Sequence, residues 1–512
     1  MSCLNFAHAP HHTPHNQHSR MYPYPAAQGG LVRGHGQGQG QGQGQGNPPS
    51  SSRAPPPPPP RTLGLICAHP TLPCVRAQPP KAAPSRQSRI TAPDMSFSAR
   101  SHRTGVAHRG FVHPPLNQAG DLCDASDRPL LCLSVSKDEE EMVVGSADHA
   151  LYAYSLKTCK PTRKLYTKAH GHIDWVSCVA HMDDGQILSG GGDGKVCLWP
   201  AARPPSSPSP FLMRGGGSMA GGGGRPAASN NSLTACEDLD GHASAVSKIL
   251  PVPDSQMAFS SGYDGLIKLW NLNSKRTLTF DAGSASRDIA VADNSPGSRS
   301  ALDPVMDFCF DAEKEQLVSG TRKGTCNVWD LQTAQQVGAL KAAHRGPVSC
   351  MMRWSASIIV TGGQDGTVKV LDTRRGMPLV AHKVNCHVDP TQGTTGAVSC
   401  LEKAGGLLAT GGADKKVCLL DPRMNFQPLH VFSHHDAPVF SLRYALAAES
   451  PVLFTGAADG VLHCVNLLSQ QVLYRLKPTQ GAVRAIASTT HLQENKMLVV
   501  ACENGKAVVF TF

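Results

Sequence analysis

"SGGGDGKVCLWP", Ser189–Pro200, decides between two interpretations of this chain. Glycines before a lysine suggest a phosphate-binding loop, but that loop requires G-x-x-x-x-G-K-[ST]. Ser189 stands where the first glycine belongs, and Val196 follows Lys195 in place of Ser or Thr. An Asp-Gly pair instead favours the positive φ of a tight turn between two strands. The residues after it are apolar on both alternating faces, which predicts a strand buried on both sides.

The same pattern occurs eight times, with its turn at Asp148, Asp193, Asp264, Lys323, Asp365, Asp414, Asp459 and Asn504. Successive turns are 45, 71, 59, 42, 49, 45 and 45 residues apart. The two long intervals contain Gly-, Ser- or Pro-rich insertions, Pro204–Ser232 and Ser284–Ala301. Without them the period is close to 45, which is typical of a repeat architecture built from radially stacked sheets.

The repeat resembles the WD-repeat β-propeller family. The resemblance rests on a Gly-His pair before the turn and a Trp after it, as in Gly171-His172 with Trp199 and in Gly241-His242 with Trp270. It covers about Pro129 to Phe512, and Trp329-Asp330 supplies the dipeptide that names the family. The resemblance implies an all-β propeller with eight blades; seven is the alternative, because unit one or unit eight could be irregular.

The resemblance also implies a buried hydrogen-bonded tetrad of His, Ser/Thr, Asp and Trp in each complete blade. Carried over, the tetrads are His172, Ser189, Asp193 and Trp199 in unit two, and His242, Ser260, Asp264 and Trp270 in unit three. The other units depart from the pattern, with Val144, Lys323, Leu371, Leu420, Val465, Asn504 and Phe510 at tetrad positions. We therefore expect two blades to be held by polar networks and the others to rely more on packing.

Propellers of this family take the outer strand of the last blade from the N-terminal side. The third strand of unit eight ends at Phe512. We therefore expect residues 101–128 to act as a linker that supplies the closing outer strand, most favourably within Thr104–Pro115. The propeller itself is expected at 129–512, with disordered insertions near 204–232 and 284–301.

The N-terminal segment differs in composition from the rest of the chain. Eleven of the 48 lysines and arginines lie in the first 120 residues with a single acid, Asp94, which leaves 37 basic and 37 acidic residues elsewhere. Residues 1–100 are rich in Gly, Gln, Pro and His, so we expect a disordered basic tail. Its run Pro55–Pro60 is a candidate ligand for an aromatic-grooved domain, with slippage in a low-complexity tract as the alternative.

The sequence offers little support for catalysis. "HGHID", His170–Asp174, mimics part of a metal motif, but the Gly-His of a WD unit explains the same letters. We expect no catalytic residues, no cofactor and no metal, no membrane span and no specific nucleic-acid partner, since the repeat region is electrically neutral. The 17 cysteines recur inside apolar runs without C-x-x-C pairs, which indicates buried thiols in a reducing compartment, the cytoplasm or the nucleus.

The best-supported function is a non-enzymatic scaffold that presents a propeller face to proteins or peptides within a multiprotein complex. In this family the exposed positions of that face correspond here to Trp175, Tyr263, Arg322 and Gln364. The alternative is a substrate receptor of a cullin-RING ubiquitin ligase. Such receptors often carry W-D-x-R, and this chain has "LDTR", Leu371–Arg374, and "LDPR", Leu420–Arg423.

The two insertions are expected on opposite faces. Pro204–Ser232 follows a third strand and should emerge away from the Asp-Gly turns, whereas Ser284–Ala301 follows an outer strand and should emerge beside them. The second carries Ser295-Pro296, a candidate proline-directed phosphorylation site near Arg322.

Overall fold

The computed structural model describes residues 110–512 apart from 168, 203–234, 240, 286–302, 390–392, 447–449 and 490–495. The tail at 1–100, the run Pro55–Pro60, the insertion Pro204–Ser232 and nearly all of Ser284–Ala301 lie outside the described residues.

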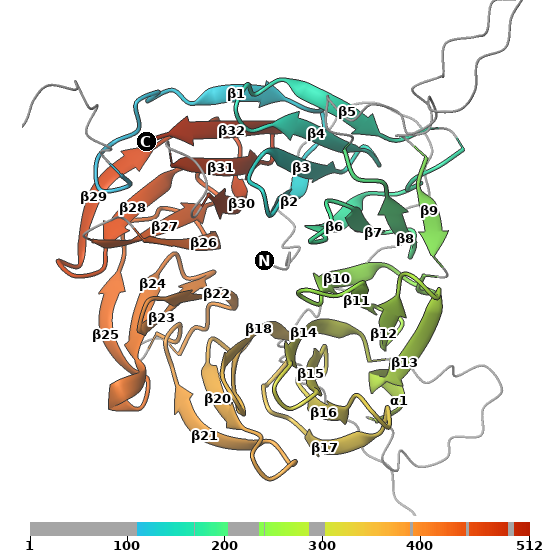
Figure 1. Cartoon of the computed structure of the whole chain (residues 1–512). Helices are drawn as coiled ribbons and strands as arrows, with labels where there is room; N and C mark the ends of the chain where they lie inside the picture. The colour runs from blue at the N-terminus through green and yellow to red at the C-terminus, as the bar shows by residue number, and fades with distance from the viewer. Residues whose placement is uncertain are drawn as a thin grey trace, which may run out of the picture. The chain divides into compact units, whose positions relative to one another are not determined.

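Within that part of the chain, 32 strands form eight four-stranded antiparallel sheets arranged as a ring (Figure 1). From the innermost strand outward, the first four blades are β2 (Leu130–Val135), β3 (Glu141–Ser146), β4 (Leu151–Ser155), β5 (Pro161–Leu165); β6 (Val176–His181), β7 (Ile187–Gly191), β8 (Val196–Trp199), β9 (Glu237–Leu239); β10 (Val246–Pro251), β11 (Met257–Gly262), β12 (Leu266–Asn271), β13 (Arg276–Asp281); and β14 (Val305–Asp311), β15 (Gln316–Thr321), β16 (Cys326–Asp330), β17 (Gln336–Leu340).

Blades five to eight continue the same order. They are β18 (Val348–Ser355), β19 (Ile358–Gly363), β20 (Val368–Asp372), β21 (Leu379–Val384); β22 (Val398–Ala404), β23 (Leu407–Gly412), β24 (Val417–Asp421), β25 (Gln427–Phe432); β26 (Val439–Leu446), β27 (Pro451–Ala457), β28 (Leu462–Asn466), β29 (Gln471–Leu476); and β30 (Val483–Ser488), β31 (Met497–Cys502), β32 (Lys506–Thr511), β1 (Asp121–Asp124). Two short helices, α1 (Ala282–Ala285) and η2 (Pro422–Met424), complete the described elements. The prediction of eight blades is confirmed.

The stretch Ser189–Pro200 covers the end of β7, the turn that follows it and all of β8. Gly194 has φ +80°, the left-handed conformation that an Asp-Gly turn needs. All four residues of β8 are buried, because blades lie on both sides of it. Since the strands of each blade are antiparallel, the turns between second and third strands all emerge on one side of the ring, which we call the turn face.

The blades contact one another through their inner strands, and these contacts continue around the ring until β30 meets β2. Ser177 of β6 donates a hydrogen bond of 2.6 Å to the carbonyl of Val246 in the next blade, and Ser349 repeats this bond to Val398. A Cβ at Gly190 would lie 2.6 Å from the Val246 side chain, so only glycine permits this approach.

The N-terminal strand closes the ring, as Figure 1 shows where β1 lies beside β32. This strand lies inside the segment 101–128, but the expectation that it falls within Thr104–Pro115 is wrong. That stretch instead places Phe111 as an apolar plug against Phe454 and Phe512, at ring-centroid distances of 5.5 and 4.9 Å. The side chain of Phe111 is buried between blades seven and eight.

Candidate functional site

The two predicted tetrads are present. In blade two, His172 Nδ1 lies 3.1 Å from Asp193 Oδ1, His172 Nε2 lies 2.7 Å from Ser189 Oγ, and Trp199 Nε1–H donates to that oxygen over 2.9 Å. Blade three repeats the network, with distances of 3.1, 2.7 and 2.8 Å among His242, Asp264, Ser260 and Trp270. Every buried ring nitrogen and hydroxyl in these networks has a partner, which is what burial of polar groups requires.

These networks also fix the backbone on the turn face. The second carboxylate oxygen of Asp193 accepts from the N–H of Ile173 at 2.8 Å. Burial alone would raise the pKa of Asp193, but hydrogen bonds from His172 and from the Ile173 N–H outweigh it and lower the pKa below its ordinary value. The ionised carboxylate therefore holds the loop between blades one and two in place.

Blades five and six also contain polar networks, although Leu371 and Leu420 replace the tryptophan there, as the sequence indicates. His344 lies 2.8 Å from Thr361 Oγ1 and 3.0 Å from Asp365 Oδ1 in blade five. Blade six has the same arrangement, with His387 2.9 Å from Thr410 Oγ1 and 2.7 Å from Asp414 Oδ1. The sequence search missed both histidines because it sought a Gly-His pair, and Ala343 and Cys386 precede them.

Blade four replaces the network in a different way. Trp329 Nε1–H still donates to Ser319 Oγ at 3.1 Å, although Lys323 occupies the turn position. A carboxylate comes from another part of the chain: the buried Asp303 accepts from the backbone N–H of Lys323 at 2.9 Å. The loss of the turn aspartate is therefore offset by a residue just before β14.

The four predicted contact residues all lie on the turn face. Three of them sit at one repeat position, where the backbone N–H of Tyr263, Arg322 and Gln364 donates to the carbonyl that precedes the innermost strand of its blade. Trp175 supplies that carbonyl in blade two. Trp175 is 38% exposed, Arg322 and Gln364 are exposed, and Tyr263 is half-buried.

Four successive blades carry these residues, so they form an arc along the turn face rather than one cluster. Ile173, which sequence reasoning did not single out, adds a second exposed apolar side chain next to Trp175, with 76% of its surface accessible. The signal that could have found it is its position directly after the tetrad histidine. The roles of all five residues remain predictions.

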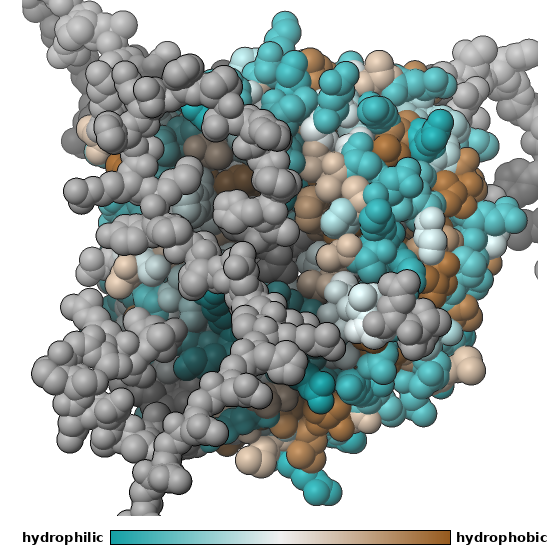
Figure 2. All heavy atoms as spheres, turned by 180° about the vertical axis from the view of Figure 1, so that it is seen from behind, coloured by the Kyte–Doolittle hydropathy of each residue, from teal (hydrophilic) through white to brown (hydrophobic). Residues whose placement is uncertain are grey.

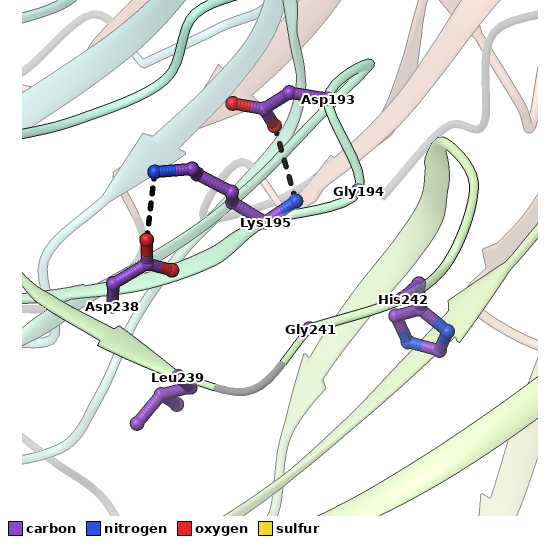
Figure 3. A pocket seen from close by; sticks show the side chains of 7 residues that line it. All are labelled: Asp193, Gly194, Lys195, Asp238, Leu239, Gly241 and His242. Carbon is purple, nitrogen blue, oxygen red and sulfur yellow. Dashed lines mark hydrogen bonds and ion pairs between the residues drawn. The ribbon is translucent and has the colours of Figure 1, made fainter.

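A pocket of about 370 Å³ lies between blades two and three and is lined by Asp193, Gly194, Lys195, Asp238, Leu239, Gly241 and His242 (Figure 3). Lys195 Nζ forms an ion pair of 2.7 Å with Asp238, while its backbone N–H donates to Asp193. Asp193 and His242 already belong to tetrads. The ionisable groups of this pocket are therefore engaged in structural contacts.

The face of the molecule seen from behind the view of Figure 1 carries both polar and apolar residues. Figure 2 shows apolar residues interspersed with polar ones over the visible described surface, rather than gathered into one broad patch. Among the described residues, neither short helix approaches the length and apolarity that a membrane-crossing helix requires.

Comparison with known proteins places these observations in a family. The family model "WD domain, G-beta repeat" matches residues 160–200, 233–271, 297–330, 335–372 and 426–466. Mitochondrial division protein 1 of Kluyveromyces lactis is 27% identical over 265 residues, 48% of this chain and 34% of that protein. Human F-box/WD repeat-containing protein 9 is 24% identical over 227 residues, 44% of each chain.

A solved structure, Chaetomium thermophilum Sqt1 bound to the N-terminus of the ribosomal protein L10, has a TM-score of 0.58 and 14% identity, and the match covers 76% of this chain and 98% of that one. The alignments with the curated relatives span at most half of the relatives' own length. Eight blades, the buried tetrads and these matches together show that the chain belongs to the WD-repeat β-propeller family.

Proposed function

We propose that this protein is a non-enzymatic scaffold that binds proteins or peptides on the turn face of its propeller. The observation that carries the proposal is the exposed pair Ile173 and Trp175 on a loop whose backbone is fixed by a buried carboxylate. A rigid aromatic anchor beside an apolar side chain suits the centre of an interface. Arg322 and Gln364 extend the same face with polar contacts.

The tetrads contribute to this function by preorganising the surface. The residue after each network histidine donates its N–H to the turn aspartate, as Ile173 does to Asp193 and Arg345 does to Asp365 at 3.0 Å. Side chains at this position therefore point from a fixed backbone, which reduces the ordering cost of binding. Sqt1, a propeller of similar fold, is described as bound to a protein N-terminus, and we propose a ligand of the same general kind here.

The test compares partner binding by a variant of the turn face with that by a variant of the opposite face. Trp175→Ala combined with Arg322→Glu should remove a set of co-purifying proteins that quantitative mass spectrometry detects with the wild type. The matched control is Leu468→Ala, an apolar residue that is 70% exposed in the turn between β28 and β29, on the opposite side of the ring. Equal loss of partners in both variants, at unchanged thermal midpoints, would reject the turn face as the binding surface.

A second candidate is a substrate receptor of a cullin-RING ubiquitin ligase. Arg374 and Arg423 are exposed at the ends of equivalent strands in adjacent blades, and each pairs with the aspartate two residues before it, at 2.5 and 2.8 Å. The likeness to an F-box/WD protein favours this candidate. Arg374→Glu with Arg423→Glu should abolish co-purification of ligase components, and a wild type that retains none of them removes this candidate.

We also propose a cytosolic or nuclear location, because the described cysteines are free thiols, most of them in the apolar interior. Burial raises the pKa of Cys178 and Cys400 to about 12, so these thiols stay protonated and inert. Fluorescence microscopy of the tagged full chain tests this location.

A further inference from the structure

Blade seven contains a group of three histidines, of which the repeat pattern explains one, the tetrad histidine His435. The ring centroids of His434, His435 and His463 are 4.4 to 4.6 Å apart. One nitrogen from each ring can be chosen so that all three lie within 4.8 Å of one another. His435 and His463 are buried and His434 is half-buried.

The register of the repeat brings these rings together. His435 is the tetrad histidine, His434 occupies the position before it, and His463 lies four residues after the turn aspartate. The positions of His434 and His463 also face each other in other blades. In blade five Lys369 donates to the carbonyl of Ala343, and blade three has the same bond from Lys268 to Gly241. Blade seven places an imidazole at both positions.

The hydrogen bonding of blade seven is incomplete as a result. His435 Nδ1 lies 3.5 Å from Asp459 Oδ2, whereas the same contact measures 2.7 to 3.1 Å in blades two, three, five and six. The Nδ1 atoms of all three histidines are buried without a hydrogen-bond partner. Buried ring nitrogens are normally satisfied, so three orphans in one place call for a ligand.

The Nε2 atoms are held in a way that suits such a ligand. Both His434 and His435 contact Thr455 Oγ1 through Nε2, at 3.1 and 2.8 Å. A hydroxyl has one proton to donate but two lone pairs, so it can accept from both rings. Both rings then carry the proton on Nε2 and have a free Nδ1 lone pair. A metal-binding histidine typically donates its other N–H to a neighbouring oxygen in this manner.

We propose that His434, His435 and His463 bind one divalent transition-metal ion of the zinc class. Three imidazole nitrogens are a ligand set that such ions prefer, and three histidines with one further position are an established zinc arrangement. Asp459, beside His435, supplies a negative charge that compensates the cation. This proposal differs from the expectation, drawn from the sequence, that the chain binds no metal.

The geometry requires a modest adjustment. Two nitrogens bound to one zinc at tetrahedral angles lie about 3.4 Å apart, so the rings must close by roughly 1 Å. His434 is the most accessible of the three side chains, since the other two are buried.

The experiment uses the full chain under reducing conditions and compares it with His434→Ala/His463→Lys. This double variant installs the pair that blade five contains at the same positions, Ala343 and Lys369, so it is designed to keep the blade folded. The probes are Co²⁺, followed by its visible absorption, and Zn²⁺, followed by the thermal midpoint. The wild type should bind one Co²⁺ equivalent more than the variant, and Zn²⁺ should raise its midpoint by several degrees more.

Two further variants separate this site from other metal-binding groups. Replacing His8, His11, His12, His15 and His18 of the tail by Ser should leave the extra equivalent in place. His463→Asn, which installs the blade-four residue Asn327, should weaken Co²⁺ binding at least tenfold. Equal stoichiometry and equal midpoint shifts for the wild type and the double variant would overturn the proposal and leave three packed histidines.

Discussion

Blades two and eight build the same four-stranded sheet by different means. Blade two places a histidine, a serine, an aspartate and a tryptophan in one buried network. Blade eight has Val500, Asn504 and Phe510 at the positions of Ser189, Asp193 and Trp199, and its interior is an apolar cluster. Blade eight is also assembled from both ends of the described chain, since β1 pairs with β32.

The comparison shows that the polar network is not needed to form a blade. Apolar burial is sufficient where the sheet is closed by a remote strand and sealed by Phe111. A network adds a fixed backbone on the turn face, because its aspartate also holds the loop that leads into the blade, as Asp193 holds Ile173. We infer that networks are placed where the surface must be rigid, and the following predictions test this difference.

The largest effect is expected from Trp199→Ala. The substitution removes a fully buried indole and leaves Ser189 without its donor, so it should cost about 3–5 kcal/mol of unfolding free energy. Trp354→Ala is the control, because Trp354 is half-buried and packs edge-on against Phe426 at 5.6 Å. Urea denaturation of both variants measures the difference, and equal losses would contradict the assigned register.

The sequence was sufficient to predict the features that repeat. The turns, the eight units and the tetrads of blades two and three recur at fixed offsets, so a single motif identifies them. His344 and His387 were missed because the ring nitrogens, not the preceding glycine, make the network. The motif therefore included a residue that the physical interaction does not need.

Other features could not be predicted because they depend on contacts between distant segments. The closing strand Asp121–Asp124 exposes three of its four side chains, as an outer edge strand does, and so has little apolar pattern. Thr104–Pro115 contains Phe111, whose side chain packs between blades seven and eight and does not belong to a strand. The proximity of His434 and His463 likewise follows from strand register across blade seven, not from their spacing in the chain.

Acid should weaken the blades that depend on ionised carboxylates. Burial opposes ionisation of Glu141, but His181, whose Nε2 lies 3.8 Å from the carboxylate, and the hydrogen-bonded Arg163 outweigh it and lower the pKa to about 2. Because the pKa is depressed in the folded state, this stabilisation is full above the unfolded value near 4.5 and is lost as the pH falls towards 2. It amounts to about 3 kcal/mol at most.

Thermal denaturation between pH 7 and pH 2 measures this dependence. Glu141→Gln should lower the midpoint at pH 7 and show a shallower decline with acid than the wild type. Parallel pH profiles for the two proteins would show that Glu141 does not contribute to the acid sensitivity.

A reciprocal exchange between two blades tests the comparison more closely. Thr361→Val in blade five leaves His344 Nε2 without its partner, and should cost about 1–2 kcal/mol. Val500→Thr, at the equivalent and fully buried position of blade eight, introduces a hydroxyl among apolar side chains and should cost a similar amount. If Val500→Thr is neutral in chemical denaturation, the interior of blade eight is not the apolar environment described.

The smallest effect on stability is expected from deletion of the two insertions. Gly283 donates its N–H to the carbonyl of Gly265 in the turn of blade three, and Asp303 holds Lys323, so both ends of the second insertion are anchored on the turn face. Ala201, at the start of the first insertion, lies beside Gly185 in the hairpin at the opposite end of blade two.

Replacing 286–301 by a short Gly-Ser linker should change the thermal midpoint by less than about 2 °C, since loop length contributes little to stability. It should nevertheless alter binding at the turn face, whereas the same replacement of 204–232 should change neither property. The measurement is the capture of partners by the two deletion proteins, at temperatures where both are folded. If the deletion of 286–301 unfolds the propeller, that segment contains a structural element of blade three or four.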